Sequence, residues 1–236
     1  MNLLDGIQLI IFDKDGTLID FDAMWGAWVT DLARRLESAT GLLITDRLFR
    51  AMGFDSGSGR VAADGPLAVT PMAILRALTV DLLREAGLSR EAAEDATTAA
   101  WREPDPVALA YPLANLPTLF RALRDRSIKI AIATTDDRAP TEATLAGLGV
   151  VPFVDAMLCA DDGVPVKPAP DMVLALCQSF DIPPSRTAVV GDSTVDLQMG
   201  RVAGAGLVVG VLSGVSNSSA LQPLADVILP SVADLV

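Results

Sequence analysis

The sequence predicts an α/β fold, in which a doubly wound and mainly parallel sheet carries an inserted α-helical domain. Three observations support this prediction. Short apolar runs recur along the chain, helix-like segments separate most of them, and the interval between about Asp20 and Pro106 shows helical periodicity alone. The composition, with 51% hydrophobic and 20% charged residues, is that of a folded globular chain.

The first apolar run, from Ile7 to Phe12, is nearly continuous and rich in β-branched residues. This pattern indicates a strand that is buried on both faces. The run ends in the polar turn Asp13-Lys14-Asp15-Gly16-Thr17, which we expect at the carboxyl end of the strand.

The inserted interval predicts three helices. The first ends at Gly41, the second begins at Thr70-Pro71 and ends at Gly87, and the third is capped by Ser89 and runs to Ala100. The side chains expected on buried faces are Trp25, Trp28, Val29, Leu32 and Leu36 in the first helix and Ile74, Leu75, Leu78 and Leu82 in the second.

The segment from Gly53 to Arg60 is expected to be a flexible loop of this interval, because it is rich in glycine and serine. The interval itself carries no strand signal. We therefore expect a sheet domain made of residues 1–19 and 107–236, with a helical domain of residues 20–106 inserted into it.

Similar apolar runs after the insertion predict strands at 128–133, 156–159, 187–190, 207–212 and 227–229. Polar turns follow the runs at Asp13, Thr134, Asp161 and Gly191. Because ligands of open α/β sheets bind outside the carboxyl ends of the strands, we expect these turns to meet at one crevice.

The formal net charge of −12 argues against binding to nucleic acids or to anionic membrane surfaces, because both rely on patches of Lys and Arg. The chain contains no histidine, which excludes Ser-His-Asp triads, Cys-His pairs, His-ligated zinc and imidazole acid/base catalysis. Catalysis would therefore depend on carboxylates, lysines, hydroxyls or a metal ion held by oxygen atoms.

The two cysteines, Cys159 and Cys177, lie in apolar segments without a Cys-x-x-Cys motif and are expected to be buried thiols, as in a reducing cytoplasm. The N-terminal segment carries Asp5 and no Lys or Arg, unlike the start of a signal peptide. No apolar run approaches the roughly 18 residues of a membrane span. We therefore expect a soluble, cytoplasmic protein.

Asp13 and Asp15 are two residues apart at the end of the first strand, so their side chains point to the same side of an extended chain. Paired carboxylates repel each other unless a cation neutralises them or one of them stays protonated. The pair therefore suits a metal site, or a nucleophile beside a general acid. A solvated turn has the same Asp-x-Asp-Gly pattern and is the alternative.

Other strand ends carry polar side chains that allow two interpretations each. Asp192 and Asp196 follow the strand 187–190 and would belong to a functional site or only stabilise the N-terminus of the next helix. Lys167 would belong to the site or lie on the surface. Thr134 would belong to the site or only cap the following helix.

This order of polar strand ends resembles the haloacid dehalogenase superfamily, a group of mostly phosphate-transferring hydrolases. Asp13-Lys14-Asp15-Gly16-Thr17 is similar to the first motif of that family, Thr134 to the second, Lys167 to the third and Gly191-Asp192-Ser193-Thr194-Val195-Asp196 to the fourth. The helical insertion resembles the α-helical cap of the family. The resemblance implies a Rossmann-like core and a Mg²⁺-dependent phosphatase of a small phosphorylated metabolite, similar to phosphoglycolate phosphatases.

The resemblance also implies roles for individual residues. Asp13 would be the nucleophile that forms an aspartyl-phosphate, and Asp15 would be the general acid and then the general base. The hydroxyl of Thr134, the backbone N–H of Thr135 and the ammonium of Lys167 would bind the phosphate oxygens.

The metal site implied by the resemblance consists of the carboxylates of Asp13 and Asp192 and the backbone carbonyl of Asp15, which would hold Mg²⁺. Asp196 would lie outside this ligand set and orient a metal-bound water or Lys167.

Substrate choice is expected to come from the cap. Arg60, in the glycine-rich loop, would pair with a substrate carboxylate or a second phosphate, and a solvated Arg60 on an exposed loop is the alternative. We expect a small phosphorylated metabolite as partner, no nucleic acid or membrane, and a monomer or a homodimer.

The sequence differs from superfamily members with other activities at the residues that those activities require. Its dehalogenases lack an acid two residues after the nucleophile, so Asp15 favours a phosphatase. Sugar phosphomutases carry a histidine where this chain has Trp25, and phosphonate hydrolases use a cap lysine, whereas the segment 20–105 contains none. A sugar phosphomutase, a dehalogenase and a non-catalytic member that binds phosphate or a partner protein are the alternatives.

Overall fold

The structure, a computed structural model, describes residues 3–70 and 72–236. The described chain forms two compact units. One holds the residues up to Asp20 together with Pro106–Val236, and the other is Phe21–Asp105. We call them the sheet unit and the helical unit. Pro71, expected at the start of the second inserted helix, lies outside the described residues.

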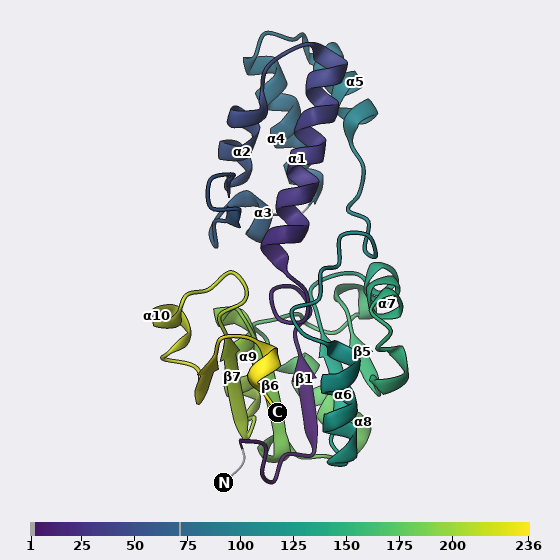
Figure 1. Cartoon of the computed structure of the whole chain (residues 1–236), viewed down its shortest axis with the longest axis vertical. Helices are drawn as coiled ribbons and strands as arrows, with labels where there is room; N and C mark the ends of the chain where they lie inside the picture. Colours follow the sequence, from purple (N-terminus) through teal and green to yellow (C-terminus); the bar gives the residue numbers. More distant parts are fainter. Residues whose placement is uncertain (1–2, 71) are drawn as a thin grey trace. The chain divides into compact units, whose positions relative to one another are not determined.

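The sheet unit contains a six-stranded sheet with the strand order β5-β4-β1-β6-β7-β8 (Figure 1). Its strands are β1 (Leu9–Phe12), β4 (Lys129–Ala133), β5 (Ala156–Leu158), β6 (Thr187–Gly191), β7 (Leu207–Val211) and β8 (Val227–Leu229). All neighbouring strands run parallel. The expected parallel sheet is thus confirmed at each of its predicted strands, with small differences at the strand ends.

Helices cover both faces of this sheet, because its central strands are apolar on both sides. The helices of the unit are α6 (Leu116–Asp125), α7 (Arg138–Gly147), α8 (Asp171–Phe180), α9 (Thr194–Ala203) and α10 (Ser218–Leu221), with 3₁₀ turns η1 (Val151–Phe153), η2 (Ala160–Asp162), η3 (Pro184–Arg186) and η4 (Val232–Asp234). In β1, Ile10 and Phe12 join a core cluster with Phe120 of α6, whereas Leu9 and Ile11 join another with α8. This alternation explains why the apolar run is continuous.

The register of the central strands brings the polar turns to one level. Phe12 of β1 lies opposite Ile132 of β4 on one side and opposite Val190 of β6 on the other. Asp13 directly follows, and its N–H donates to the carbonyl of Val190 at 2.9 Å. The turns after β1, β4 and β6 therefore leave the same edge of the sheet side by side, as expected from the sequence.

The helical unit contains more helices than the sequence predicts. Its helices are α1 (Phe21–Thr40), α2 (Thr45–Met52), α3 (Pro66–Val69), α4 (Met72–Glu85) and α5 (Arg90–Ala100). Gly41 and Gly87, at the expected helix ends, have positive φ angles of 70° and 106°, and Ser89 caps α5 by accepting a hydrogen bond from the N–H of Ala92. The three expected helices are confirmed, and the short α2 and α3 are additions.

The buried face of α4 differs from the expected one. Ile74 is 52% exposed and Leu78 is half-buried, whereas Thr79 and Leu83 are buried. The prediction that Ile74 is a core residue is therefore wrong. Thr79 can lie on the buried face because its hydroxyl donates to the carbonyl of Leu75 at 2.9 Å, so its burial leaves this polar group satisfied.

Two short strands, β2 (Phe54–Asp55) and β3 (Arg60–Val61), pair antiparallel within the segment for which the sequence predicts a flexible loop. The prediction of a strand-free interval is therefore wrong. The Asp55 carboxylate accepts hydrogen bonds from the N–H of Gly57 at 2.9 Å and the hydroxyl of Ser58 at 2.6 Å. Strands of two residues carry no alternating pattern, so the sequence could not reveal them.

Two further expectations concern the cysteines and possible membrane spans. Cys159 and Cys177 are both buried free thiols, as predicted. Over the ranges that the structure describes, none of the helices is long and apolar enough to cross a membrane.

Asp155 ties α6 to β4. Its carboxylate accepts hydrogen bonds from Arg124 at 2.6 Å, from Lys129 at 2.9 Å and from the N–H of Ile130 at 2.9 Å. Burial alone would raise the pKa of Asp155, but these donors outweigh it and lower the pKa below its usual range. A lowered folded-state pKa means that the ionised carboxylate stabilises the fold above its unfolded pKa, and that this stability is lost as pH falls through the folded pKa.

We expect Asp155→Asn to lower the free energy of unfolding by about 1–2 kcal/mol near pH 7, because its two cationic partners are partly exposed. The difference from the native protein should shrink below about pH 4, where the unfolded chain begins to protonate this carboxylate, and should disappear as pH falls through the lower folded-state pKa. Urea unfolding of both proteins between pH 3 and pH 7, with the exposed Asp125→Asn as control, measures this. A difference that is the same at every pH would contradict the assignment.

Candidate active site

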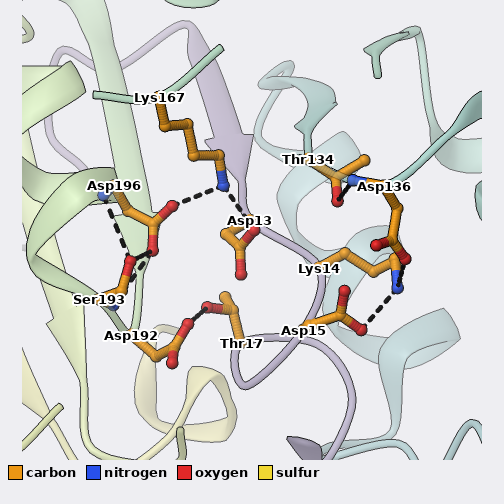
Figure 2. A network of polar contacts seen from close by, with 10 residues as sticks. All are labelled: Asp13, Lys14, Asp15, Thr17, Thr134, Asp136, Lys167, Asp192, Ser193 and Asp196. Atoms are coloured by element: carbon orange, nitrogen blue, oxygen red, sulfur yellow. Dashed lines mark hydrogen bonds and ion pairs between the residues drawn. The ribbon is translucent and has the colours of Figure 1, made fainter. Parts of the chain in front are cut away.

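Asp13 and Lys167 form the centre of the site at the carboxyl edge of the sheet. The Lys167 Nζ lies 2.5 Å from Oδ1 of Asp13 and 2.5 Å from Oδ1 of Asp196 (Figure 2). Burial alone would lower the pKa of Lys167, but the two carboxylates outweigh it and raise the pKa above its usual range. The buried lysine therefore carries its charge and holds turns from two strands together.

Asp192 directly follows β6 and is buried. Its Oδ1 accepts a hydrogen bond from the Thr17 hydroxyl at 3.2 Å, and its Oδ2 accepts one from the N–H of Val215 at 2.8 Å. Burial first, and then the charges of Asp13 and Asp196, raise the pKa of Asp192 well above its usual value. Asp192 is thus a buried acid held in place by neutral donors.

Asp196 lies in the first turn of α9, and its two carboxylate oxygens contact different residues, Ser193 and Lys167. Its Oδ2 accepts hydrogen bonds from the N–H of Ser193 at 3.1 Å and from the Ser193 hydroxyl, while the Ser193 oxygen accepts from the N–H of Asp196. This reciprocal capping of α9 fixes the carboxylate and leaves Oδ1 directed at Lys167.

The carboxylates of Asp13, Asp192 and Asp196 fit a cation. Each offers one oxygen, and these oxygens lie within 4.8 Å of one another. Lys167 is paired with two of them, and within the described chain no lysine or arginine forms an ion pair with Asp192. Burial raises the pKa of Asp13 to about 7, and the charges of Asp196 and Asp15 add to this rise against the lowering effect of Lys167. A divalent cation that prefers oxygen ligands suits this donor set.

Asp15 lies on the other side of Asp13, in a second cluster. Its Oδ1 is 2.6 Å from the Nζ of Lys14, and the same ammonium is 2.9 Å from Oδ2 of Asp136 (Figure 2). Burial raises the pKa of Asp15 above its usual value, against the lowering effect of Lys14. Asp15 is therefore held by a lysine of its own.

Thr134 and Thr135 follow β4, next to the turn after β1. Thr134 is buried, and its hydroxyl oxygen accepts a hydrogen bond from the N–H of Asp136 at 3.1 Å. Thr135 is exposed. Their roles in phosphate binding stay predictions, as does that of Arg60, an exposed residue of β3 whose guanidinium is 3.6 Å from the Asp22 carboxylate.

Several residues of the site were not singled out by sequence reasoning. Lys14 and Asp136 hold Asp15, Thr17 donates to Asp192, and Ser193 fixes Asp196. The signal for Lys14 was present, since a lysine between two aspartates at the end of a buried strand has carboxylates on both sides in the sequence. The partners of Thr17 and Asp136 lie far away in the chain, and no local pattern indicates them.

The comparison with known families agrees with this architecture. The sequence profile of the haloacid dehalogenase-like hydrolases matches residues 7–204, which cover most of the sheet unit and the whole helical unit. The chain therefore belongs to the haloacid dehalogenase-like hydrolases.

The chain is also similar to individual members of this family. The chain is 28% identical over 203 residues to a phosphoglycolate phosphatase of Rhodospirillum rubrum, covering 86% of this chain and 78% of the relative. It is 29% identical over 196 residues to the fructose-1-phosphate phosphatase YqaB of Escherichia coli, covering 83% and 92%. A solved structure from Thermotoga maritima, assigned to the β-phosphoglucomutases, has a TM-score of 0.71 at 19% identity and covers 97% of this chain and 96% of its own. This last likeness shows the fold alone.

The loop after β7 packs against Asp192, and a Cβ atom added at Gly214 would overlap the Asp192 carboxylate. We expect Gly214→Ala to displace this carboxylate, to lower the stability by about 1–3 kcal/mol and to weaken cation binding at least tenfold. The midpoint of thermal stabilisation by added MgCl₂ measures the binding. Gly57→Ala, in an exposed turn, should keep the native midpoint. An unchanged midpoint for Gly214→Ala would show that Asp192 does not contribute to the cation site.

Proposed function

We propose that the protein is a phosphatase that hydrolyses a small phosphorylated metabolite, with Asp13 as the nucleophile. The observation that carries the proposal is the position of Asp13, which lies at the carboxyl edge of the sheet with Lys167 on one side and the acid Asp15 close by. Two relatives named as phosphatases, of phosphoglycolate and of fructose 1-phosphate, support this choice of reaction.

In the first step a carboxylate oxygen of Asp13 attacks the phosphorus atom of the ester. The bond between phosphorus and the ester oxygen breaks, and Asp15 gives its proton to the departing alkoxide. The products are an alcohol and an aspartyl-phosphate on Asp13. The raised pKa of Asp15 suits this role, because an acid must hold its proton until the bond breaks.

In the second step a water molecule attacks the phosphorus atom of the aspartyl-phosphate. Asp15, now ionised, takes one proton from the water, and the bond between phosphorus and Asp13 breaks. Inorganic phosphate leaves, and both aspartates return to their starting states.

The non-bridging phosphate oxygens need positive charge and hydrogen-bond donors while the phosphoryl group moves. We propose that Lys167, the Thr134 hydroxyl and the Thr135 N–H supply them. Mg²⁺ would be held by the carboxylates of Asp13 and Asp192 and by the backbone carbonyl of Asp15, with the Asp196 carboxylate close to this set. When bound, it supplies the positive charge that this group of three carboxylates lacks.

Phosphate release from a panel of phosphorylated compounds tests this proposal. The panel contains 2-phosphoglycolate, sugar phosphates and nucleotides, each measured with MgCl₂ and again with a chelator. We expect release that depends on Mg²⁺, and a decrease of at least about 1000-fold in Asp13→Asn, because this variant lacks the nucleophile.

Asp125→Asn serves as the surface control and should keep full activity, and melting temperatures confirm that each variant is folded. Substantial activity of folded Asp13→Asn would contradict a covalent mechanism. Transfer of the phosphoryl group within a sugar phosphate, without phosphate release, would instead identify a phosphomutase.

The helical insertion, residues 20–106 by the sequence prediction, is proposed to act as the cap that selects the substrate. We expect Arg60 to pair with a substrate carboxylate or a second phosphate, so that Arg60→Ala raises KM about tenfold or more and leaves kcat largely unchanged. Steady-state kinetics with the best substrate of the panel measure this. Arg90→Ala, on an exposed face of α5, is the matched control, and an unchanged KM in Arg60→Ala would refute the assignment.

A further inference from the structure

Lys14 is a buried cation close to the site, and it has no role in the two steps proposed above. It is 2% exposed and lies between Asp13 and Asp15 in the sequence. Its backbone carbonyl accepts hydrogen bonds from the N–H groups of Leu18 at 2.8 Å and Ile19 at 3.2 Å, which folds the turn after β1. Burying an ammonium is costly unless it is paired and hydrogen-bonded, so the partners of Lys14 explain where it lies.

The two partners of Lys14 come from different strand ends. Asp15 follows β1, and its Oδ1 is 2.6 Å from the ammonium. Asp136 follows β4, and its Oδ2 is 2.9 Å from the same nitrogen. Lys14 thus links the carboxylate of Asp15 to the turn after the neighbouring strand.

Asp136 is a firm anchor because its own backbone is fixed. Its N–H donates to the Thr134 hydroxyl oxygen at 3.1 Å, and its carbonyl accepts from the N–H of Ala160 at 2.9 Å. The position of Lys14, and through it the position of Asp15, is therefore tied to β4 and to η2.

The contact occupies one oxygen of Asp15 only. Lys14 donates to Oδ1, and over the described ranges no hydrogen bond reaches Oδ2 (Figure 2). An oxygen that accepts a short hydrogen bond from an ammonium is poorly placed to carry a proton itself. The free oxygen, Oδ2, is the one left for proton transfer.

We propose that Lys14 is a positioning residue, which holds Oδ1 of Asp15 on an anchor formed by Asp136 so that Oδ2 exchanges the proton with the leaving group. The inference rests on the proposed function, since it gives Asp15 the role of the acid. Without Lys14 the Asp15 side chain is free to rotate, and the proton is no longer held next to the ester oxygen.

The experiment compares two phosphate esters that differ in their need for an acid. The leaving group of glycerol 2-phosphate is an alkoxide that must be protonated, whereas p-nitrophenyl phosphate releases a stable anion. The quantity compared is kcat/KM, because it reports the steps through release of the leaving group. The proteins are the native chain, Lys14→Met, Lys14→Arg, Asp136→Ala and the control Lys129→Met, which removes a half-exposed lysine at the start of β4.

We expect Lys14→Met to lower kcat/KM for glycerol 2-phosphate at least about 30-fold and that for p-nitrophenyl phosphate less than about threefold. Asp136→Ala should lower the ratio of the two kcat/KM values, glycerol 2-phosphate over p-nitrophenyl phosphate, by a smaller factor than Lys14→Met does. Lys14→Arg should have a ratio between those of Lys14→Met and the native protein, and Lys129→Met should keep the native ratio. An equal loss for both esters, or no loss for either, would overturn the inference, because a structural role of Lys14 would not depend on the leaving group.

A crystal structure of Lys14→Met provides a readout that does not need activity. We expect the Asp15 carboxylate to leave its native position, and a carboxylate that stays within about 0.5 Å of it would overturn the inference. The failure of the proposed function is a separate result, recognised by the absence of phosphate release by the native protein with every ester tested.

Discussion

The burial of several carboxylates beside one another is the constraint on which the rest of the site depends. Asp13, Asp192 and Asp196 lie at one edge of the sheet, and their mutual repulsion adds to the cost of removing each charge from water. Lys167 compensates part of this charge by bridging two of them. In the proposed reaction, the part that stays uncompensated would attract a cation, and the cation would allow a phosphate to lie next to a carboxylate nucleophile.

The strand order makes this arrangement possible. Because β1 lies between β4 and β6, the turn that carries Asp13 and Asp15 has a neighbouring turn on each side. The segment after β6 contributes Asp196, which pairs with Lys167, and the turn after β4 contributes Asp136, which pairs with Lys14. Each buried lysine thus bridges two carboxylates from different strand ends. The proposed nucleophile, Asp13, is therefore paired with Lys167, whereas the proposed acid, Asp15, is paired with Lys14.

Neutral groups keep the acids in place without cancelling their charge. Ser193 fixes Asp196 through the cap of α9, and Thr17 and the N–H of Val215 hold Asp192. Hydrogen bonds of this kind orient a carboxylate without adding a cation beside it, which suits the metal-binding role proposed for Asp192. The close approach of Gly214 to Asp192 shows that the loop after β7 also helps to fix the position of this carboxylate.

The sequence by itself determined the parallel sheet, its strands and the convergence of Asp13, Thr134, Lys167 and Asp192, since buried parallel strands are continuous apolar runs and their polar ends meet at one edge. Only the tertiary structure decided the short strands β2 and β3, the exposed position of Ile74 and the pairing of the charged groups. Thr17 and Asp192 are 175 residues apart, and Lys167 and Asp13 are 154 apart. A local pattern shows which side chains are polar, but which of them touch depends on the strand order and register, which only the folded chain fixes.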